Sequence, residues 1–143
     1  MSDVKIDDLE ELWKAGAVNM QQVAGQFGEA GINLHKAGVS ESSVFEGADP
    51  KLTEAWARLR NMFQDKVLYK SYEHCVKSGN ALANIAISIS KQDTDNEEDL
   101  KQIIKQTKNS DVDDDRPPSY VPEAPKSGDE HPREYPAGPG DFR

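Results

Sequence analysis

Reactive side chains are few in this chain of 143 residues, and their spacing decides what chemistry they support. Cys75 directly follows His74, and a thiol beside an imidazole is a pair that nucleophilic enzymes use. Consecutive residues of a helix point about 100° apart, so these two side chains would diverge on a helix. The other histidines, His35 and His131, are distant in the sequence. We therefore predict no catalytic residues and a protein that is not an enzyme.

An acidic run before the proline-rich end suggests a metal site at first sight, and it comprises Asp111, Asp113, Asp114 and Asp115. The helix–loop–helix calcium motif requires glycine at its sixth position and glutamate at its twelfth. Those positions hold Arg116 and Pro122 here. Because no Cys/His spacing suits zinc either, we predict a solvated acidic run and a protein without metal or cofactor.

Residues 117–120, Pro-Pro-Ser-Tyr, match the ligand of WW domains, which bind extended polyproline segments. In a bacterial protein the match would be a coincidence within a proline-rich segment. In a eukaryotic protein it would recruit a partner. The sequence leaves both interpretations open.

The net charge of −9 argues against two classes of partner. An acidic surface repels nucleic acid and anionic membranes. No apolar run is long enough for stable membrane insertion, and the acidic start of the chain does not resemble a cleaved Sec-type signal peptide. Because only 36% of the residues are hydrophobic, we also expect a thin core without a large enclosed pocket.

Apolar and small residues recur with alternating spacings of three and four over residues 6–37, which predicts one long helix. Bulky residues occupy every seventh position, and a second series, offset by three, includes small residues such as Gly16 and Ala30. Glycines at positions 16, 25, 28 and 31 each cost a helix about 0.5–1 kcal/mol relative to alanine. Tertiary packing must therefore offset this cost.

Residues 38–50 interrupt this pattern, and a second helix is predicted to follow. Asp49 is a suitable N-cap and Pro50 a suitable first helical residue. The apolar stripe of the second helix slips near Lys66 and then resumes, and the helix is expected to extend to about residue 107 with a polar interruption at 93–96. Residues 109–143 hold seven of the eight prolines, a composition typical of disorder.

The predicted fold is all-α: an antiparallel two-helix hairpin at residues 1–108, with its turn at about 38–50, and a disordered acidic, proline-rich tail at 109–143. Its aromatic residues are too many for a two-helix contact to cover, so we expect two chains to form a four-helix bundle. The expected pairing interface comprises Trp13, Met20, Phe27, Leu34, Trp56, Phe63, Leu68, Leu82 and Ile89.

A helix, a turn carrying Phe45-Glu46-Gly47 and a second helix resemble the WXG family of helical hairpins exported by type VII secretion systems, in which the turn reads Trp-x-Gly. The resemblance covers about residues 6–100. It extends to the end of the second helix, where positions that fit the longer relatives of the family are Gly79, Leu82, Ile85, Ala86, Asp93 and Asn96.

The resemblance implies a non-enzymatic substrate or co-secreted partner that acts by dimerisation, either with itself or with a second hairpin protein. A secretion ATPase is a further implied partner. Asp93 and Asn96 would be the remainder of the family's export motif, while Ile89 stands where the family has its export tyrosine. The chain would then be secreted without a cleaved signal peptide, or remain cytoplasmic if the missing tyrosine abolishes export.

A different class of function remains open from the sequence. In this alternative, the chain is a cytoplasmic coiled-coil adaptor or scaffold that recruits partners through its proline-rich tail. Neighbouring genes would discriminate between the two, since a secretion ATPase or a second hairpin gene favours the first.

Overall fold

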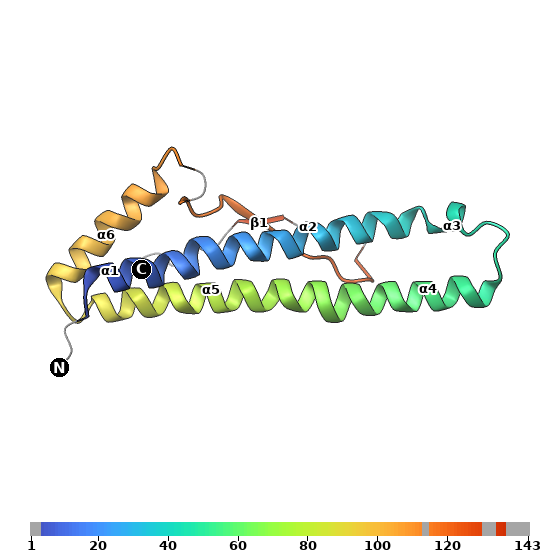
Figure 1. Ribbon diagram of the computed structural model, residues 1–143, viewed down its shortest axis with the longest axis horizontal. Coiled ribbons are helices and arrows are strands. Elements are labelled where there is room, and N and C mark those ends of the chain that lie inside the picture. The colour runs from blue at the N-terminus through green and yellow to red at the C-terminus, as the bar shows by residue number, and fades with distance from the viewer. Residues whose placement is uncertain (1–3, 113–114, 130–133, 137–143) are drawn as a thin grey trace.

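The computed structural model describes residues 4–112, 115–129 and 134–136, and helices dominate it (Figure 1). The first helical run consists of α1 (Ile6–Lys14), the π-helical segment η1 (Ala15–Asn19) and α2 (Met20–Val39). Asp7 and Asp8 lie in the first turn, where negative charge favourably opposes the helix dipole. The all-α prediction is confirmed.

The second helical run follows the short helix α3 (Glu41–Val44) and consists of α4 (Pro50–Phe63), η2 (Gln64–Leu68) and α5 (Tyr69–Ser90). It begins as the sequence predicts. The carboxylate of Asp49 accepts a hydrogen bond of 2.9 Å from the backbone N–H of Lys51, and Pro50 is the first helical residue. The two runs lie side by side in antiparallel directions (Figure 1).

Both runs contain one π-helical turn. A π-helical turn inserts an extra residue into an α-helix and rotates the stripe that follows it. The segment η2 coincides with the slip that the sequence shows near Lys66. The segment η1 has no such signal in the sequence and is an additional feature of the first run.

The main core lies at the end of the molecule where α1, η1, α5 and a further helix meet. Trp13 is completely buried there, together with Leu9, Ala17, Val18, Ala83, Ala86, Ile87, Leu100 and Ile104. Most of these partners are small or aliphatic, so the indole of Trp13 fills the space between closely packed helices. This core forms within a single chain.

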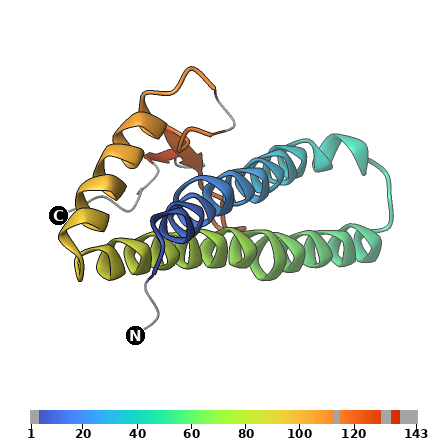
Figure 2. The ribbon, with the colours of Figure 1, turned by 60° about the vertical axis from the view of Figure 1, so that its left-hand side comes forward.

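The expected continuation of the second helix to residue 107 is corrected by the structure. The helix α5 ends at Ser90, the chain reverses, and α6 (Thr94–Lys108) packs against α1 and α5 (Figure 2). Leu100 and Ile104 of α6 are buried in the main core. The hairpin therefore carries a third packed layer that periodicity alone did not reveal.

The expected disordered tail is also corrected for the part that the structure describes. Residues 115–129 run back along α2 instead, with Val121 and Ala124 buried against it. Within this stretch, β1 (Tyr120–Pro122) pairs antiparallel with β2 (Glu134–Pro136). We call Tyr120–Ser127 the strap. Residues 113–114, 130–133 and 137–143 of the predicted tail lie outside the described residues.

None of the described helices combines the length and apolar character needed to cross a membrane.

Candidate interaction surface

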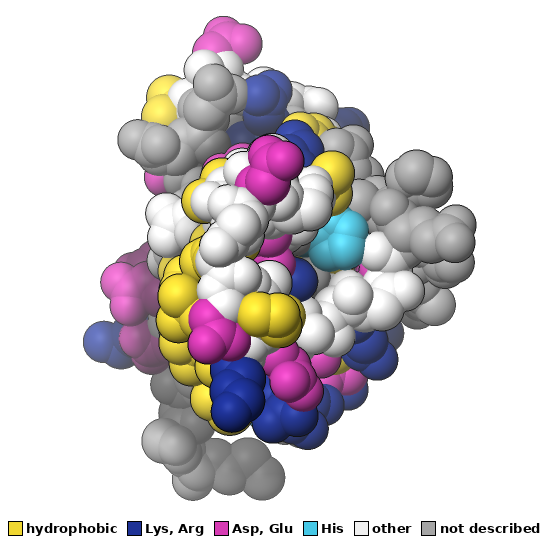
Figure 3. Space-filling model, turned by 90° about the vertical axis from the view of Figure 1, so that its right-hand side faces the viewer, with side chains coloured by type: hydrophobic (Ala, Val, Ile, Leu, Met, Phe, Trp, Pro, Cys, Tyr) yellow, Lys and Arg dark blue, Asp and Glu magenta, His cyan; other side chains and the backbone are white. Residues whose placement is uncertain are grey.

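The helix α4 differs from the other long helices because none of its residues is buried. Its apolar side chains instead face outward: Leu59 is 53% exposed and Met62 57% exposed. We define the α4 surface as these two residues together with Leu52, Trp56, Phe63 and the adjoining Val67 of η2. Figure 3 looks onto the α3–α4 end of the molecule, where hydrophobic side chains gather along one side. An amphipathic helix with an uncovered apolar stripe is a typical binding element.

This surface is uncovered because α2 and α4 diverge toward the α3 end (Figure 2). A polar arrangement fills the space between them. The guanidinium of Arg60 lies against Gly38 of α2, where an added Cβ would be 2.8 Å from Nη1, and it forms an ion pair with Glu41. The two core clusters contain no residue of α4, and the apolar stripe of α4 is left exposed.

The predicted turn motif lies beside this surface. The ring of Phe45 contacts that of Trp56, with a centroid distance of 6.1 Å, and the indole Nε1 of Trp56 donates a hydrogen bond of 3.0 Å to Glu41 Oε1. Gly47 has φ of +80°, a backbone conformation that favours glycine. Phe45 and Gly47 therefore fix the direction in which the chain enters α4 and hold Trp56 in place.

The nine predicted pairing residues do not form one surface in a single chain. Trp13 and Leu68 are buried, and only Trp56 and Phe63 belong to the α4 surface. The remaining five are half-buried, namely Met20, Phe27, Leu34, Leu82 and Ile89. The chain's own α5, α6 and strap cover much of the stripe that was expected to face a partner.

Four members of the α4 surface were not among the predicted pairing residues, namely Leu52, Leu59, Met62 and Val67. The sequence contains the signal for two of them, because Leu52 and Leu59 continue the spacing of Trp56 and Phe63. It does not contain the divergence of α2 and α4, which is what leaves the stripe uncovered.

The predicted export-like residues lie at the corner between α5 and α6. Asp93 caps α6, with its carboxylate accepting hydrogen bonds from the backbone N–H groups of Asp95 at 3.0 Å and Asn96 at 3.5 Å. The side-chain amide of Asn96 donates to the carbonyl of Val4 at 3.3 Å and so ties the start of the chain to this corner. Both residues thus have a local structural role, whatever else they do.

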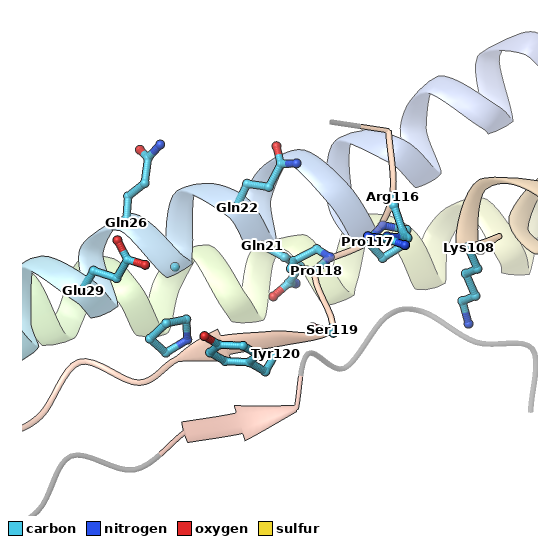
Figure 4. A pocket seen from close by; sticks show the side chains of 12 residues that line it. Gln21, Gln22, Gln26, Glu29, Lys108, Arg116, Pro117, Pro118, Ser119 and Tyr120 are labelled. Carbon is cyan, nitrogen blue, oxygen red and sulfur yellow. The ribbon is translucent and has the colours of Figure 1, made fainter. Parts of the chain in front are cut away.

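A second feature is a hollow of about 710 Å³ between α2, the end of α6 and the start of the strap (Figure 4). Glutamine side chains of α2 line one side, and the Pro-Pro-Ser-Tyr segment at 117–120 lines the other. Pro117 is buried and Tyr120 is about half exposed. The WW-type sequence is therefore folded back on the helices instead of extending into solvent.

The side chains considered for catalysis do not converge. Cys75 is half-buried beside the cluster that contains Tyr72 and Val121, whereas His74 is exposed. Among the residues that the structure describes, no group of His, Cys, Asp and Glu side chains is placed to hold a metal ion.

Comparison of the chain with protein-family models, with curated protein sequences and with solved structures finds no match in any of the three.

Proposed function

We propose that this protein is a non-enzymatic helical pairing protein, and that its α4 surface binds a second copy of the chain. One observation carries the proposal: α4 buries none of its 14 residues while it exposes five large apolar side chains. Together with Val67, these half-exposed side chains amount to roughly 500 Å² of apolar surface, which is the size of the largest apolar patch on a typical monomeric protein, a patch that is often functional.

A second copy fits this surface in a two-fold antiparallel arrangement. When two α4 helices cross at Leu59, each residue faces the one at the same distance on the other side of Leu59. Phe63 then lies opposite the exposed Ala55, and Trp56 opposite the flexible Met62. Bulky aromatic side chains thus meet small or adaptable ones, which is the complementarity that a self-matching interface requires.

The charges beside the stripe support self-association. Arg58 pairs with Glu54 at 2.6 Å, and Arg60 pairs with Glu41, so both cations are neutralised within their own chain. Two copies therefore approach without unpaired arginines facing each other. A partner with a strongly acidic surface would gain little from these two arginines.

The resemblance to the WXG family extends the proposal. The paired hairpin would be a substrate or co-secreted partner of a type VII secretion system. Two features support this extension: the turn with Phe45 and Gly47 between the two helical runs, and the position of Asp93 and Asn96 directly after α5. Because Ile89 replaces the export tyrosine, export of the paired chains would need a second hairpin protein that bears that tyrosine and binds outside the α4 surface.

Two measurements test the two parts separately. Sedimentation equilibrium of the purified chain is expected to give the mass of a dimer that dissociates on dilution, and a monomer at all accessible concentrations would contradict pairing. Immunoblotting of culture filtrates is expected to detect the chain only when the secretion system works. Retention in the cells under both conditions would remove the secretion role and favour the cytoplasmic adaptor.

A further inference from the structure

The strap lies in a groove whose floor is made of glycine. Gly25, Gly28 and Gly31 recur every third residue on α2, where they form one continuous face. A Cβ atom added to Gly28 would lie 1.7 Å from the carbonyl oxygen of Pro122, and one added to Gly31 would lie 3.1 Å from Cβ of Ala124. The groove thus accepts a backbone at a distance that any larger residue at Gly28 would prevent.

Apolar side chains complete the groove. Val121 and Ala124 of the strap are buried with Ala24 and Tyr72, and the half-buried residues packed against them are Phe27, Tyr69, Cys75 and Val76. The two apolar strap residues are separated by Pro122 and Glu123, and both are buried in this one cluster although the strap forms no helix of its own. The groove therefore selects an extended chain with small apolar residues.

Polar groups of η2 hold the far end of the strap. The fully buried Gln64 donates from Nε2 to the carbonyl oxygen of Pro125 at 3.0 Å. The carboxylate of Asp65 accepts two hydrogen bonds of 2.7 Å from Ser127, one from its backbone N–H and one from its hydroxyl. The ammonium of Lys126 lies 4.6 Å from the ring centroid of Tyr69. The hydrogen bonds of Gln64 and Asp65 to backbone atoms of the strap are of a kind typical of sites that recognise peptides.

We propose that this groove is a peptide-binding site that exchanges its occupant, and that residues 120–127 of a second copy bind it in place of the chain's own strap. Residues 109–119 join the strap to α6, and these 11 residues span at most about 36 Å when extended. That reach is enough for the strap to cross to an adjacent molecule. Exchange of an identical segment is a low-cost route to association, because each groove keeps the same contacts.

This inference does not depend on the α4 surface. The groove lies on α2, α5 and η2, whereas every residue of the α4 surface except Val67 lies on α4, none of whose residues contacts the strap cluster. An experiment that rules out one of the two proposed contacts therefore does not rule out the other.

A labelled peptide of residues 118–129 tests the groove directly in the full chain. Ala124→Asp places a carboxylate where Ala124 is completely buried and so releases the chain's own strap. The peptide is expected to bind this variant saturably in a fluorescence anisotropy titration. Its binding to the unaltered chain should be at least about tenfold weaker, because the attached strap competes at an effective concentration in the millimolar range.

The matched control is the double variant Ala124→Asp/Gly28→Ala, in which the strap is released and the groove floor is blocked. Loss of peptide binding in this control is expected. Equal binding to the control, or no saturable binding to Ala124→Asp while its circular dichroism remains helical, would overturn the proposal. If Ala124→Asp does not fold, Ser127→Pro serves as the released form, since it removes both donors to Asp65 from a turn outside the helices.

Complementary full chains test whether a second copy is the occupant. A Gly28→Ala chain retains a normal strap but has a blocked groove, and an Ala124→Asp chain has an open groove but a defective strap. Both also carry Leu59→Asp, so that the α4 surface contributes nothing. A labelled 1:1 mixture is expected to show energy transfer that neither chain shows with itself. No transfer in the mixture, with peptide binding intact, would rule out the second copy.

Discussion

Gly16 and Gly79 face each other where the first helical run crosses α5. A Cβ atom on Gly16 would lie 2.3 Å from the carbonyl oxygen of Gly79, and a Cβ atom on Gly79 would lie 2.6 Å from the carbonyl oxygen of Gly16. Real Cβ atoms do not approach backbone oxygens so closely. The two backbones therefore touch at this point, and the buried Trp13 lies in the core that this close crossing helps to form.

Replacing Gly79 with alanine is expected to destabilise the fold by about 1–3 kcal/mol, because the added methyl group forces the two helices apart. Gly25→Ala is the matched control, since its Cβ would find only the ring of Pro122 at an ordinary contact distance of 3.7 Å. The control should gain about 0.5–1 kcal/mol from helix propensity. Urea unfolding followed by circular dichroism measures both, and equal effects in the two variants would refute the close crossing.

The turn before α4 gives a second prediction. Gly47→Ala is expected to cost about 1 kcal/mol, because a residue with a Cβ is strained at the φ of +80° found there. Gly128→Ala is the control, as both glycines have open space around an added Cβ. Thermal unfolding compares them, and an unchanged midpoint for Gly47→Ala would mean that the turn does not require glycine.

Substitutions of Asp93 separate its role as a cap from a role in export. Asp93→Ala removes the acceptor of the first N–H groups of α6 and is expected to cost about 1 kcal/mol. Asp93→Asn preserves an acceptor and should unfold almost like the unaltered chain. If Asp93→Asn is stable but no longer reaches the culture filtrate, the carboxylate is read by the secretion system. Normal export of both variants would show that Asp93 serves only as the N-cap of α6.

Glu73 provides a prediction about pH. Hydrogen bonds from Lys77 and, to a lesser extent, Lys70 hold the pKa of Glu73 at about 2, below its ordinary value of 4.5. A carboxyl group whose pKa is lowered by folding stabilises the folded chain above its ordinary pKa, and this stabilisation is lost as the pH falls toward 2. Lys77→Met should therefore raise the pKa of Glu73, as measured by carboxyl-carbon NMR titration.

The control for this titration is Lys101→Met, which removes a cation that hydrogen-bonds to Glu97 at 2.7 Å on α6. The pKa of Glu73 should not change in this variant. If the pKa of Glu73 in the unaltered chain has its ordinary value, the two lysines do not lower it in solution.

The positions of the two helical runs could be predicted because their signals are local. The N-cap at Asp49, the proline at position 50 and the slip near Lys66 all correspond to features of the structure. The end of α5 was harder to predict, because the polar residues 91–96 fit both an exposed helical turn and a helix cap. In the structure Asp93 caps α6, so α5 ends before it and the chain reverses there.

The strap and the α4 surface could not be predicted from the same signals. Val121 and Ala124 are isolated among prolines and acidic residues, and such a composition is typical of disorder. The groove that receives them is visible in the sequence only as glycines spaced by three on α2. The exposure of α4 depends on the divergence of two helices, which is a tertiary property that no periodicity encodes.

The mass of two matched variants tests the central claim most directly. Leu59 lies at the centre of the α4 surface, while Ile85 is a similarly exposed apolar residue on α5, with 53% and 49% of their surfaces accessible. All chains carry Gly28→Ala, which blocks association through the strap. By sedimentation equilibrium, the chain with this change alone and the chain that adds Ile85→Asp should both be dimers, whereas the chain that adds Leu59→Asp should be a folded monomer. A dimer that survives Leu59→Asp in this background, or a monomer without Leu59→Asp, would contradict pairing through α4.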